Sequence, residues 1–405
     1  MKISTLFFSL TIVFYACSNP GVSSSFKSGF DADEARDLIQ ICNSFSFIDL
    51  YGSDSEILPK NYKKVYTSPV YGMDNKFQIY VKQDASIGVI NFRGSTSKQI
   101  SWLENLYASM IPVKDKISIN DDVFKYQLGE KDESHVHAGY TLAIYFMKDD
   151  LLKQISELNK QGIYAFYITG HSQGGALAQI FRAYFDYLPN KELNKKNTFK
   201  VYAFANPMIG NTSFSNEYYK KYGESGMSYL IHNSDDFVTK LPISYNDSTF
   251  WSSHLSELLS NQDGFSTTGF AIEGALNLFK SKINDVAIKM SKNIESKLLE
   301  DLGKIKMPAF YPEINYVHTG NIINIPPTEY PLELKDSSIL KNDSLMAIYS
   351  RDDNGIFENK SLYKKSKPTL QHKSYNYYTA ILKKYFPEEY SNLKEKYFIN
   401  PENRR

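Results

Sequence analysis

The chain has 405 residues, enough for one large domain with an insertion or for two domains. Its 46 Lys and Arg residues are balanced by 45 Asp and Glu residues, so there is no basic field for a nucleic-acid partner and no acidic tail. Aromatic residues make up 15% of the chain, which favours a packed structure over a disordered one.

The first residues predict export. Lys2 precedes an uncharged, largely apolar run over 3–15, which is well short of the roughly 20 residues that a membrane-spanning helix needs. Cys17 directly follows Ala16, and this pair resembles the lipobox of bacterial lipoproteins, in which the thiol is acylated and becomes the mature N-terminus. The alternative is an ordinary cleaved signal in which Cys17 is incidental.

We therefore expect a signal peptide over 1–16 and an exported cell-envelope lipoprotein, on the periplasmic or surface side, held to the membrane by a lipid anchor on Cys17. Residues 17–30, rich in Ser, Gly and Asn, predict a tether. The other cysteine, Cys42, then has no partner and is expected to be a small apolar side chain within a helix.

The folded part begins with a helix that Asp31 or Asp33 can cap. Residues 77–81 and 87–92 are short apolar runs that predict a β-hairpin. From 99 to 110 apolar residues recur at helical spacing and predict a short amphipathic helix. This helix either packs on the core as a surface helix or acts as a lid that shields an apolar active site; the lid candidates are Ile100, Trp102, Leu103 and Leu106.

A longer helix is expected from about residue 136, followed by strands over 163–169, 199–204 and 229–232 with a helix of small residues after the first of them. Strands and helices that alternate with crossovers of this length predict a parallel sheet covered by helices on both faces. Residues 243–310 depart from this pattern and predict an inserted helical cap, with amphipathic helix from 272 to 302. Beyond it, 318–325 are strand-like, 331–366 are polar and loop-rich, and 375–385 predict a closing helix.

The strand over 163–169 runs into Gly170-His171-Ser172-Gln173-Gly174, a G-x-S-x-G pattern. This pattern is typical of a nucleophile elbow, a strained strand-to-helix turn that holds a serine hydroxyl clear of the sheet. Serine catalysis in such folds needs an acid and then a histidine later in the chain. The acid candidates Asp235 and Asp236 follow a strand, and the histidines beyond Ser172 are His232, His254, His318 and His372.

Several stretches in the same order resemble motifs of the fungal-type class 3 lipases, a family of α/β-hydrolases. Phe92-Arg-Gly-Ser95 resembles F-R-G-S/T, and His137-Ala-Gly-Tyr140 resembles H-x-G-F. Gly170-His-Ser-Gln-Gly-Gly-Ala-Leu-Ala178 resembles G-H-S-L-G-G-A-L-A, and the stretches 206–211 and 236–242 resemble P-R-V-G-N and D-x-V-P-x-L-P. The motifs span about 77–242, with a weaker C-terminal match at Gln371-His-Lys-Ser-Tyr375, which resembles the late H-x-x-Y element.

The resemblance implies an α/β-hydrolase fold over 31–242 and 311–405, with a central, mostly parallel sheet, helices on both faces and the helical insertion. It implies Ser172 as nucleophile, Asp236 as the orienting acid and His372 as the base, with His318 as the alternative base. It also implies an oxyanion hole made by the main-chain N–H of Gln173 and by the N–H and hydroxyl of Ser95. Gln173 replaces the family's usual Leu, which we expect to make the pocket more polar.

The function that the resemblance implies is hydrolysis of acyl esters of lipids through an acyl-enzyme on Ser172, without a metal or cofactor. Two alternatives stay open. The fold could serve as a cell-envelope binding or effector protein that has lost catalysis, or the acyl group could pass to another alcohol, as in an acyltransferase. Protein partners are not indicated by the sequence.

Overall fold

The computed structural model describes residues 26–51, 57–96, 98–242, 283–328, 332–351, 357–365 and 368–397. The expected signal peptide, Cys17, most of the tether and His254 therefore lie outside the described residues, as does the first part of the expected cap. Within the described residues, no helix is both long enough and apolar enough to span a membrane.

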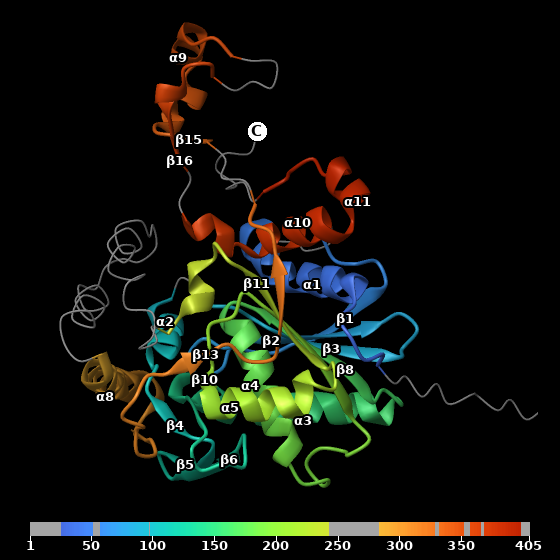
Figure 1. Ribbon diagram of the computed structural model, residues 1–405, viewed down its shortest axis with the longest axis vertical. Helices are drawn as coiled ribbons and strands as arrows, with labels where there is room; N and C mark the ends of the chain where they lie inside the picture. The colour runs from blue at the N-terminus through green and yellow to red at the C-terminus, as the bar shows by residue number, and fades with distance from the viewer. Residues whose placement is uncertain are drawn as a thin grey trace, which may run out of the picture.

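A mixed seven-stranded sheet forms the centre of the molecule, in the order β1-β2-β3-β8-β9-β11-β14 (Figure 1). The first three strands pair antiparallel, and the remaining pairs are parallel. The strands are β1 (Tyr62–Thr67), β2 (Phe77–Lys82), β3 (Ile87–Phe92), β8 (Ala165–His171), β9 (Thr198–Phe204), β11 (Ser228–Asn233) and β14 (Asn321–Ile325). The carboxyl ends of β3, β8, β9 and β11 consequently meet at one edge of the sheet.

Helices cover both faces of this sheet (Figure 1). On one face α1 (Ala32–Tyr51) and α10 (Ser374–Tyr385) bury Leu38 and Ile381 with side chains of the strands. On the other, α3 (Ala138–Lys160), α4 (Gln173–Tyr187) and α5 (Thr212–Tyr218) contribute Leu142, Phe181 and Phe214 to a larger core. Burial on both faces explains why the central strands are continuous apolar runs. The expected α/β-hydrolase architecture is confirmed.

Smaller elements extend this body. A four-stranded sheet has the order β13-β10-β7-β4, and a three-stranded sheet has the order β12-β5-β6. Their strands are β4 (Met110–Pro112), β5 (Lys114–Ile119), β6 (Asp122–Gln127), β7 (His135–His137), β10 (Gly210–Asn211), β12 (Ile305–Lys306) and β13 (Tyr316–Val317). Further elements are α2 (Gln99–Leu106), η1 (Tyr219–Gly223), η2 (Phe237–Lys240), α8 (Ile283–Leu302), η6 (Pro368–His372) and α11 (Pro387–Asn392).

Helix α2 is shorter than the sequence predicts. The chain leaves the helical conformation at Tyr107, and Met110, the last residue of the expected helix, instead begins strand β4, which pairs with β7. The apolar side chain of Met110, taken as part of the helical stripe, is buried through this pairing. Periodicity could not separate the two outcomes because a single apolar residue fits either repeat.

The stretch 331–366 contains more regular structure than expected. Strands β15 (Leu332–Leu334) and β16 (Tyr363–Lys365) pair antiparallel, with η4 (Ser337–Lys341), α9 (Asp343–Ile348) and η5 (Lys360–Leu362) between them. Figure 1 shows these elements standing away from the central sheet. Strands of three residues give too short a pattern for sequence reasoning to detect.

The described part of the expected cap is α8 and the segment after it. Ile294 and Leu298 of α8 are fully buried in the core shared with α3 and α4. The hydroxyl of Tyr107, directly after α2, donates to a carboxyl oxygen of Glu295 at 2.6 Å. Helix α8 therefore packs against the main body next to α2.

Glycines allow β8 and α4 to approach each other more closely than side chains would permit. A Cβ added at Gly170 would lie 2.3 Å from the backbone of Gly174, and one at Gly174 would lie 2.2 Å from the carbonyl oxygen of Phe92. Both distances are well inside van der Waals contact and involve backbone atoms, which can move only if the strand moves.

We predict that Gly174→Ala lowers the free energy of unfolding by about 3 kcal/mol, because the added methyl overpacks a backbone contact. Thermal unfolding of the variant and the parent chain measures the change. Ser156→Ala, on the exposed face of α3, is the control and should alter stability little. Equal melting temperatures for Gly174→Ala and the parent chain would show that the strand and helix can separate without cost.

Candidate active site

Ser172 lies at the turn between β8 and α4, at the carboxyl edge of the sheet. Its backbone has φ 59° and ψ −131°, in the left-handed region that non-glycine residues rarely occupy. Its N–H donates to the carbonyl of Phe204 at 2.9 Å, which ties the turn to the neighbouring strand β9. The strained turn is the geometry expected of a nucleophile elbow, and it presents the Ser172 hydroxyl outside the sheet.

Ser172, His372 and Asp236 form a continuous hydrogen-bonded series. His372 Nε2 lies 2.8 Å from Ser172 Oγ, and His372 Nδ1 lies 2.8 Å from Asp236 Oδ2. The Asp236 side chain is fully buried, whereas the His372 side chain is 20% exposed. The three residues come from the elbow, from η6 and from the turn after β11, so the fold brings together positions that are up to 200 residues apart.

The Asp236 carboxylate has two further donors. The hydroxyl of Tyr377 donates to Oδ2 at 2.8 Å, and the N–H of Val238 donates to Oδ1 at 2.9 Å. These bonds fix the carboxylate plane toward the imidazole of His372 and compensate the burial of its charge. Tyr375, the last residue of the stretch that resembles H-x-x-Y, does not contact Asp236: its hydroxyl donates to the carbonyl oxygen of Glu395. The sequence alone offers no means to decide which of Tyr375 and Tyr377 contacts Asp236.

The alternative base His318 lies elsewhere. Its Nε2 is 2.8 Å from the carbonyl oxygen of Thr239, and its ring centre is 5.2 Å from that of His232. Asp235 is exposed beside its buried neighbour, as expected for a surface residue. The structure therefore places His372, and not His318, between Ser172 and Asp236.

Two other histidines near the site are held neutral. Burial lowers the pKa of His171 well below its usual value, and its ring centre lies 4.8 Å from that of His372. Burial also lowers the pKa of His137 to about 3. The His137 ring stacks on Tyr140 and accepts from the N–H of that residue at the start of α3. Neither imidazole therefore places a positive charge beside the site.

The residues expected to form an oxyanion hole lie beside Ser172. Gln173 is the first residue of α4, so helix geometry supplies no carbonyl acceptor for its N–H. Ser95 follows β3, and its hydroxyl donates to Gln173 Oε1 at 2.7 Å. The Gln173 side chain is only 1% exposed. The expectation that it makes the pocket more polar is therefore wrong, because this amide points into the protein interior.

Asp74 holds the loop that carries Ser95. Its carboxylate lies 2.8 Å from Lys98 Nζ and 3.1 Å from Arg93 Nη2, and it accepts from the hydroxyl of Thr96 at 2.5 Å. Burial acts to raise the pKa of Asp74, but the hydrogen bonds from Lys98 and Thr96 and the charge of Arg93 outweigh it and lower the pKa. The carboxylate stays charged and fixes both sides of Ser95.

The lid candidates lie on α2. Leu103 is buried, Ile100 and Leu106 are partly buried against the core, and Trp102 is partly exposed. The helix therefore packs as a surface helix in this conformation. Its role as a lid stays a prediction.

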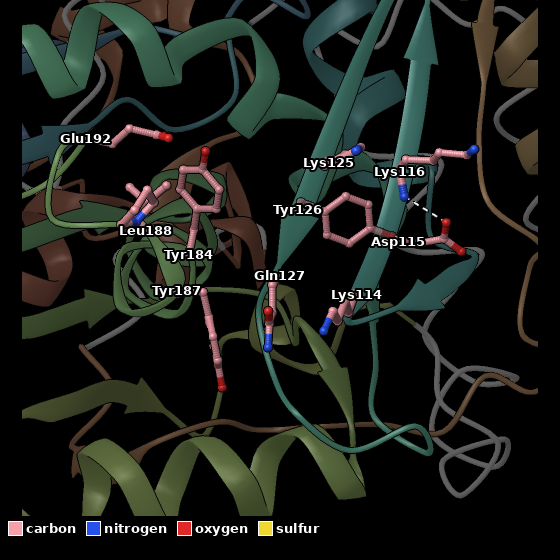
Figure 2. A pocket seen from close by; sticks show the side chains of 11 residues that line it. Lys114, Asp115, Lys116, Lys125, Tyr126, Gln127, Tyr184, Tyr187, Leu188 and Glu192 are labelled. Atoms are coloured by element: carbon pink, nitrogen blue, oxygen red, sulfur yellow. Dashed lines mark hydrogen bonds between the residues drawn. The ribbon is translucent and has the colours of Figure 1, made fainter.

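A hollow of about 430 Å³ lies between the β5–β6 hairpin and the end of α4 (Figure 2). Lysine and tyrosine side chains line it, among them Lys114, Lys125, Tyr126 and Tyr184. None of Ser172, His372, Asp236 and Ser95 contributes to its lining. Within the described residues, no group of three or more His, Cys, Asp or Glu side chains is arranged to hold a metal ion.

The part of the chain that contains the elbow and the strands around it is similar to known proteins. Residues 89–246 match the family model of the class 3 lipases. The matched segment contains Ser95, Ser172 and Asp236 and ends before His372.

The chain is also similar in sequence or in structure to individual known proteins. The secreted mono- and diacylglycerol lipase LIP4 of Malassezia restricta is 28% identical over 169 residues, which cover 40% of this chain and 50% of that protein. Phospholipase A1-II 1 of Oryza sativa subsp. indica is 26% identical and is covered to 40%, for 39% of this chain. The Rhizomucor miehei lipase in its propeptide complex is 20% identical with a TM-score of 0.38, over 54% of this chain and 66% of that chain. The chain thus spans about half the length of the first relative.

We predict that Tyr377→Phe slows the reaction of Ser172 with a fluorophosphonate probe by roughly tenfold, since a hydrogen bond to a charged group is worth about 1.5–3 kcal/mol. The ring is retained, so packing in α10 should persist. The measurement is the second-order labelling rate. Tyr375→Phe is the matched control and should label at the parent rate; equal rates for both variants would remove Tyr377 from the site.

Proposed function

We propose that the chain is a serine carboxylic-ester hydrolase that cleaves acyl esters of lipids. The observation that carries this proposal is the series Ser172–His372–Asp236, with both hydrogen bonds at 2.8 Å. The class 3 lipase match over 89–246 supports the reaction type. Relatives whose names specify mono- and diacylglycerols or phospholipids support lipid esters as the substrate class.

The reaction begins when Ser172 Oγ attacks the ester carbonyl carbon and transfers its proton to His372 Nε2. Asp236 accepts from His372 Nδ1, holds the imidazole in the required tautomer and stabilises its positive charge. The tetrahedral intermediate places its oxyanion at the N–H groups of Gln173 and Ser95. His372 then gives its proton to the leaving alcohol, and an acyl-enzyme on Ser172 remains.

Deacylation repeats these steps with water. His372 removes a proton from the attacking water, a second tetrahedral intermediate forms at the same donors, and the proton returns to Ser172 Oγ as the carboxylic acid leaves. The partial exposure of His372 gives water a route to the imidazole. Every step uses side chains and main-chain N–H groups of this chain.

We predict that Ser172→Ala abolishes hydrolysis of short p-nitrophenyl esters, because no other group can form the acyl-enzyme. His372→Ala should lower kcat by at least about 10⁴-fold, while His318→Ala should leave most of the activity, because His372 contacts Ser172 and His318 contacts Thr239 instead. Steady-state rates of the three variants and the parent chain provide the measurement. Turnover retained by Ser172→Ala would sink the proposed function, and a reversed ranking of the histidines would reassign the base.

We also propose that the protein is exported and attached to the cell envelope through lipidated Cys17. The apolar run after Lys2 and the Ala16-Cys17 pair support this location, and relatives are named as secreted lipases. A lipid anchor would hold the enzyme at a surface that contains its substrates.

We predict that the full chain, expressed in a bacterium supplied with radiolabelled palmitate, incorporates label and sediments with membranes. Cys17→Ser should lose both properties, because the acylated thiol is absent, while Cys42→Ser should keep them. Label in Cys17→Ser, or export of the parent chain without label, would contradict lipidation.

A further inference from the structure

A buried chain of polar side chains runs from the oxyanion-hole residue Ser95 to a carboxyl group inside the protein. The Ser95 hydroxyl donates to Gln173 Oε1 at 2.7 Å, and Gln173 Nε2 donates to Asn75 Oδ1 at 3.2 Å. Asn75 Nδ2 then donates to Glu104 Oε2 at 2.6 Å. Gln173, Asn75 and Glu104 are each at most 1% exposed.

Glu104 is an expensive residue to bury in the place it occupies, on the inner side of α2. It has no ion-pair partner among the described residues, and its Oε1 has no hydrogen-bond partner among them. The helix α3 approaches so closely that a Cβ on Gly139 would lie 2.1 Å from the Glu104 carbonyl oxygen. A carboxyl that only filled space here could be replaced by an apolar side chain without this cost.

The Glu104 carboxyl fixes the donor and the acceptor of each hydrogen bond in this series of buried side chains. An ionised carboxylate can only accept, so Asn75 must turn its NH2 group toward Glu104 and its oxygen toward Gln173. Gln173 must then turn its NH2 group toward Asn75 and its oxygen toward Ser95. The Ser95 hydroxyl, facing an acceptor, donates its proton to Gln173 and not toward the position of an oxyanion.

We propose that Glu104, acting through Asn75 and Gln173, is a positioning residue that decides whether the Ser95 hydroxyl donates to Gln173 or to the oxyanion. The proposal rests on the proposed function. With Glu104 ionised, its negative charge polarises the chain and strengthens the hold of Gln173 Oε1 on the Ser95 proton. With Glu104 neutral, the hold weakens and the hydroxyl can turn to the oxyanion.

The turn of the hydroxyl leaves no buried acceptor unsatisfied. Asn105 Nδ2 lies 2.9 Å from Gln173 Oε1 and 2.9 Å from Ser95 Oγ, so it continues to donate to Gln173 when Ser95 rotates. The side-chain oxygen Oδ1 of Asn105 accepts from the hydroxyl of Tyr140 at 2.8 Å, which keeps the Asn105 amide in this orientation. Only the Ser95 proton changes its acceptor.

The switch falls in an accessible pH range. Burial raises the pKa of Glu104 to about 8, while the hydrogen bond from Asn75 opposes the shift. The carboxyl is therefore mostly neutral below pH 8 and mostly ionised above it. Below this pKa, the oxyanion hole should have both main-chain N–H donors and the Ser95 hydroxyl. Above it, the Ser95 hydroxyl should no longer donate to the oxyanion.

The other titratable groups on the elements around Glu104 keep one charge state through this range. On α3, burial raises the pKa of Tyr140 well above its usual value, with a smaller contribution from Glu104, and His137 at its start stays neutral. In the loop before β2, Asp74 stays ionised beside Arg93 and Lys98.

Tyr107, the residue directly after α2, has its pKa raised by burial and by Glu295 of α8. Burial also raises the pKa of Glu295, which makes that residue a useful control.

The test is the pH dependence of kcat and KM for a short p-nitrophenyl ester from about pH 6 to about pH 10, with Ser172→Ala as the blank. We expect kcat of the parent chain to fall by at least about tenfold around pH 8, since loss of one oxyanion donor costs on the order of 10² to 10³. The fall should appear in kcat and not in KM, because the oxyanion exists only after attack. Glu104→Gln, which cannot ionise, should lose the fall, and Glu295→Gln should retain it.

Gln173→Leu keeps the main-chain N–H but interrupts the hydrogen-bonded series of side chains between Glu104 and Ser95. Its kcat should therefore not fall above about pH 8, although Glu104 still titrates. Infrared difference spectra across the same pH range follow the Glu104 carboxyl directly: its protonated band should be present in the parent chain and in Gln173→Leu and absent in Glu104→Gln. If the alkaline fall is absent from the parent chain, or persists in Glu104→Gln or in Gln173→Leu, the proposal is overturned. If the parent chain hydrolyses no faster than Ser172→Ala, the proposed function itself has failed.

Discussion

The site depends on one backbone constraint, the close contact between β8 and α4 on either side of Ser172. A residue with left-handed φ at a strand end is costly, and it is kept only because the surrounding structure allows no other path. Gly170 and Gly174 let the helix backbone reach the strands, and the hydrogen bond from Ser172 N–H to Phe204 holds the turn. Once the turn is fixed, the hydroxyl and the first N–H groups of α4 point to the same side, where the ends of β3 and β11 bring Ser95 and Asp236.

The features that were predictable from the sequence depend on local patterns. Apolar runs predicted β2, β3, β8, β9 and β11, and apolar residues at helical spacing predicted α1, α3 and α10. Both patterns arise because a buried face of a strand or helix requires apolar residues at regular positions. The elbow was predictable because Gly170 and Gly174 flank Ser172 in the local pattern G-x-S-x-G directly after an apolar strand. The expectation that Asp236 is the orienting acid followed from its place after a strand together with the resemblance to class 3 lipases.

The remainder depends on contacts between distant residues. Tyr377 binds Asp236 across 141 positions, and nothing in its own neighbourhood separates it from Tyr375. The residues Asn75 and Glu104 lie in an ordinary turn and an ordinary amphipathic helix, so their part in a buried chain appears only when β3, α2 and α4 converge. Gln173 was visible as a departure from the family pattern, but the direction of its side chain was not. The sequence indicated a polar pocket, whereas the structure turns the same amide inward.

The hydrogen bond between Tyr107 and Glu295 attaches the end of α2 to α8. Helix α2 is tied to the elbow through Asn105, which donates to Gln173 Oε1, and to α8 through the Tyr107 hydroxyl, so a rigid movement of α2 away from both breaks the bond to the Glu295 carboxyl. Such a bond is worth about 1.5–3 kcal/mol, comparable to the gain from burying one large apolar side chain in a lipid surface. If α2 acts as a lid, its opening has to offset the loss of this hydrogen bond, which the burial of Trp102 and its apolar neighbours together at an extended lipid surface can do more readily than contact with a single substrate molecule.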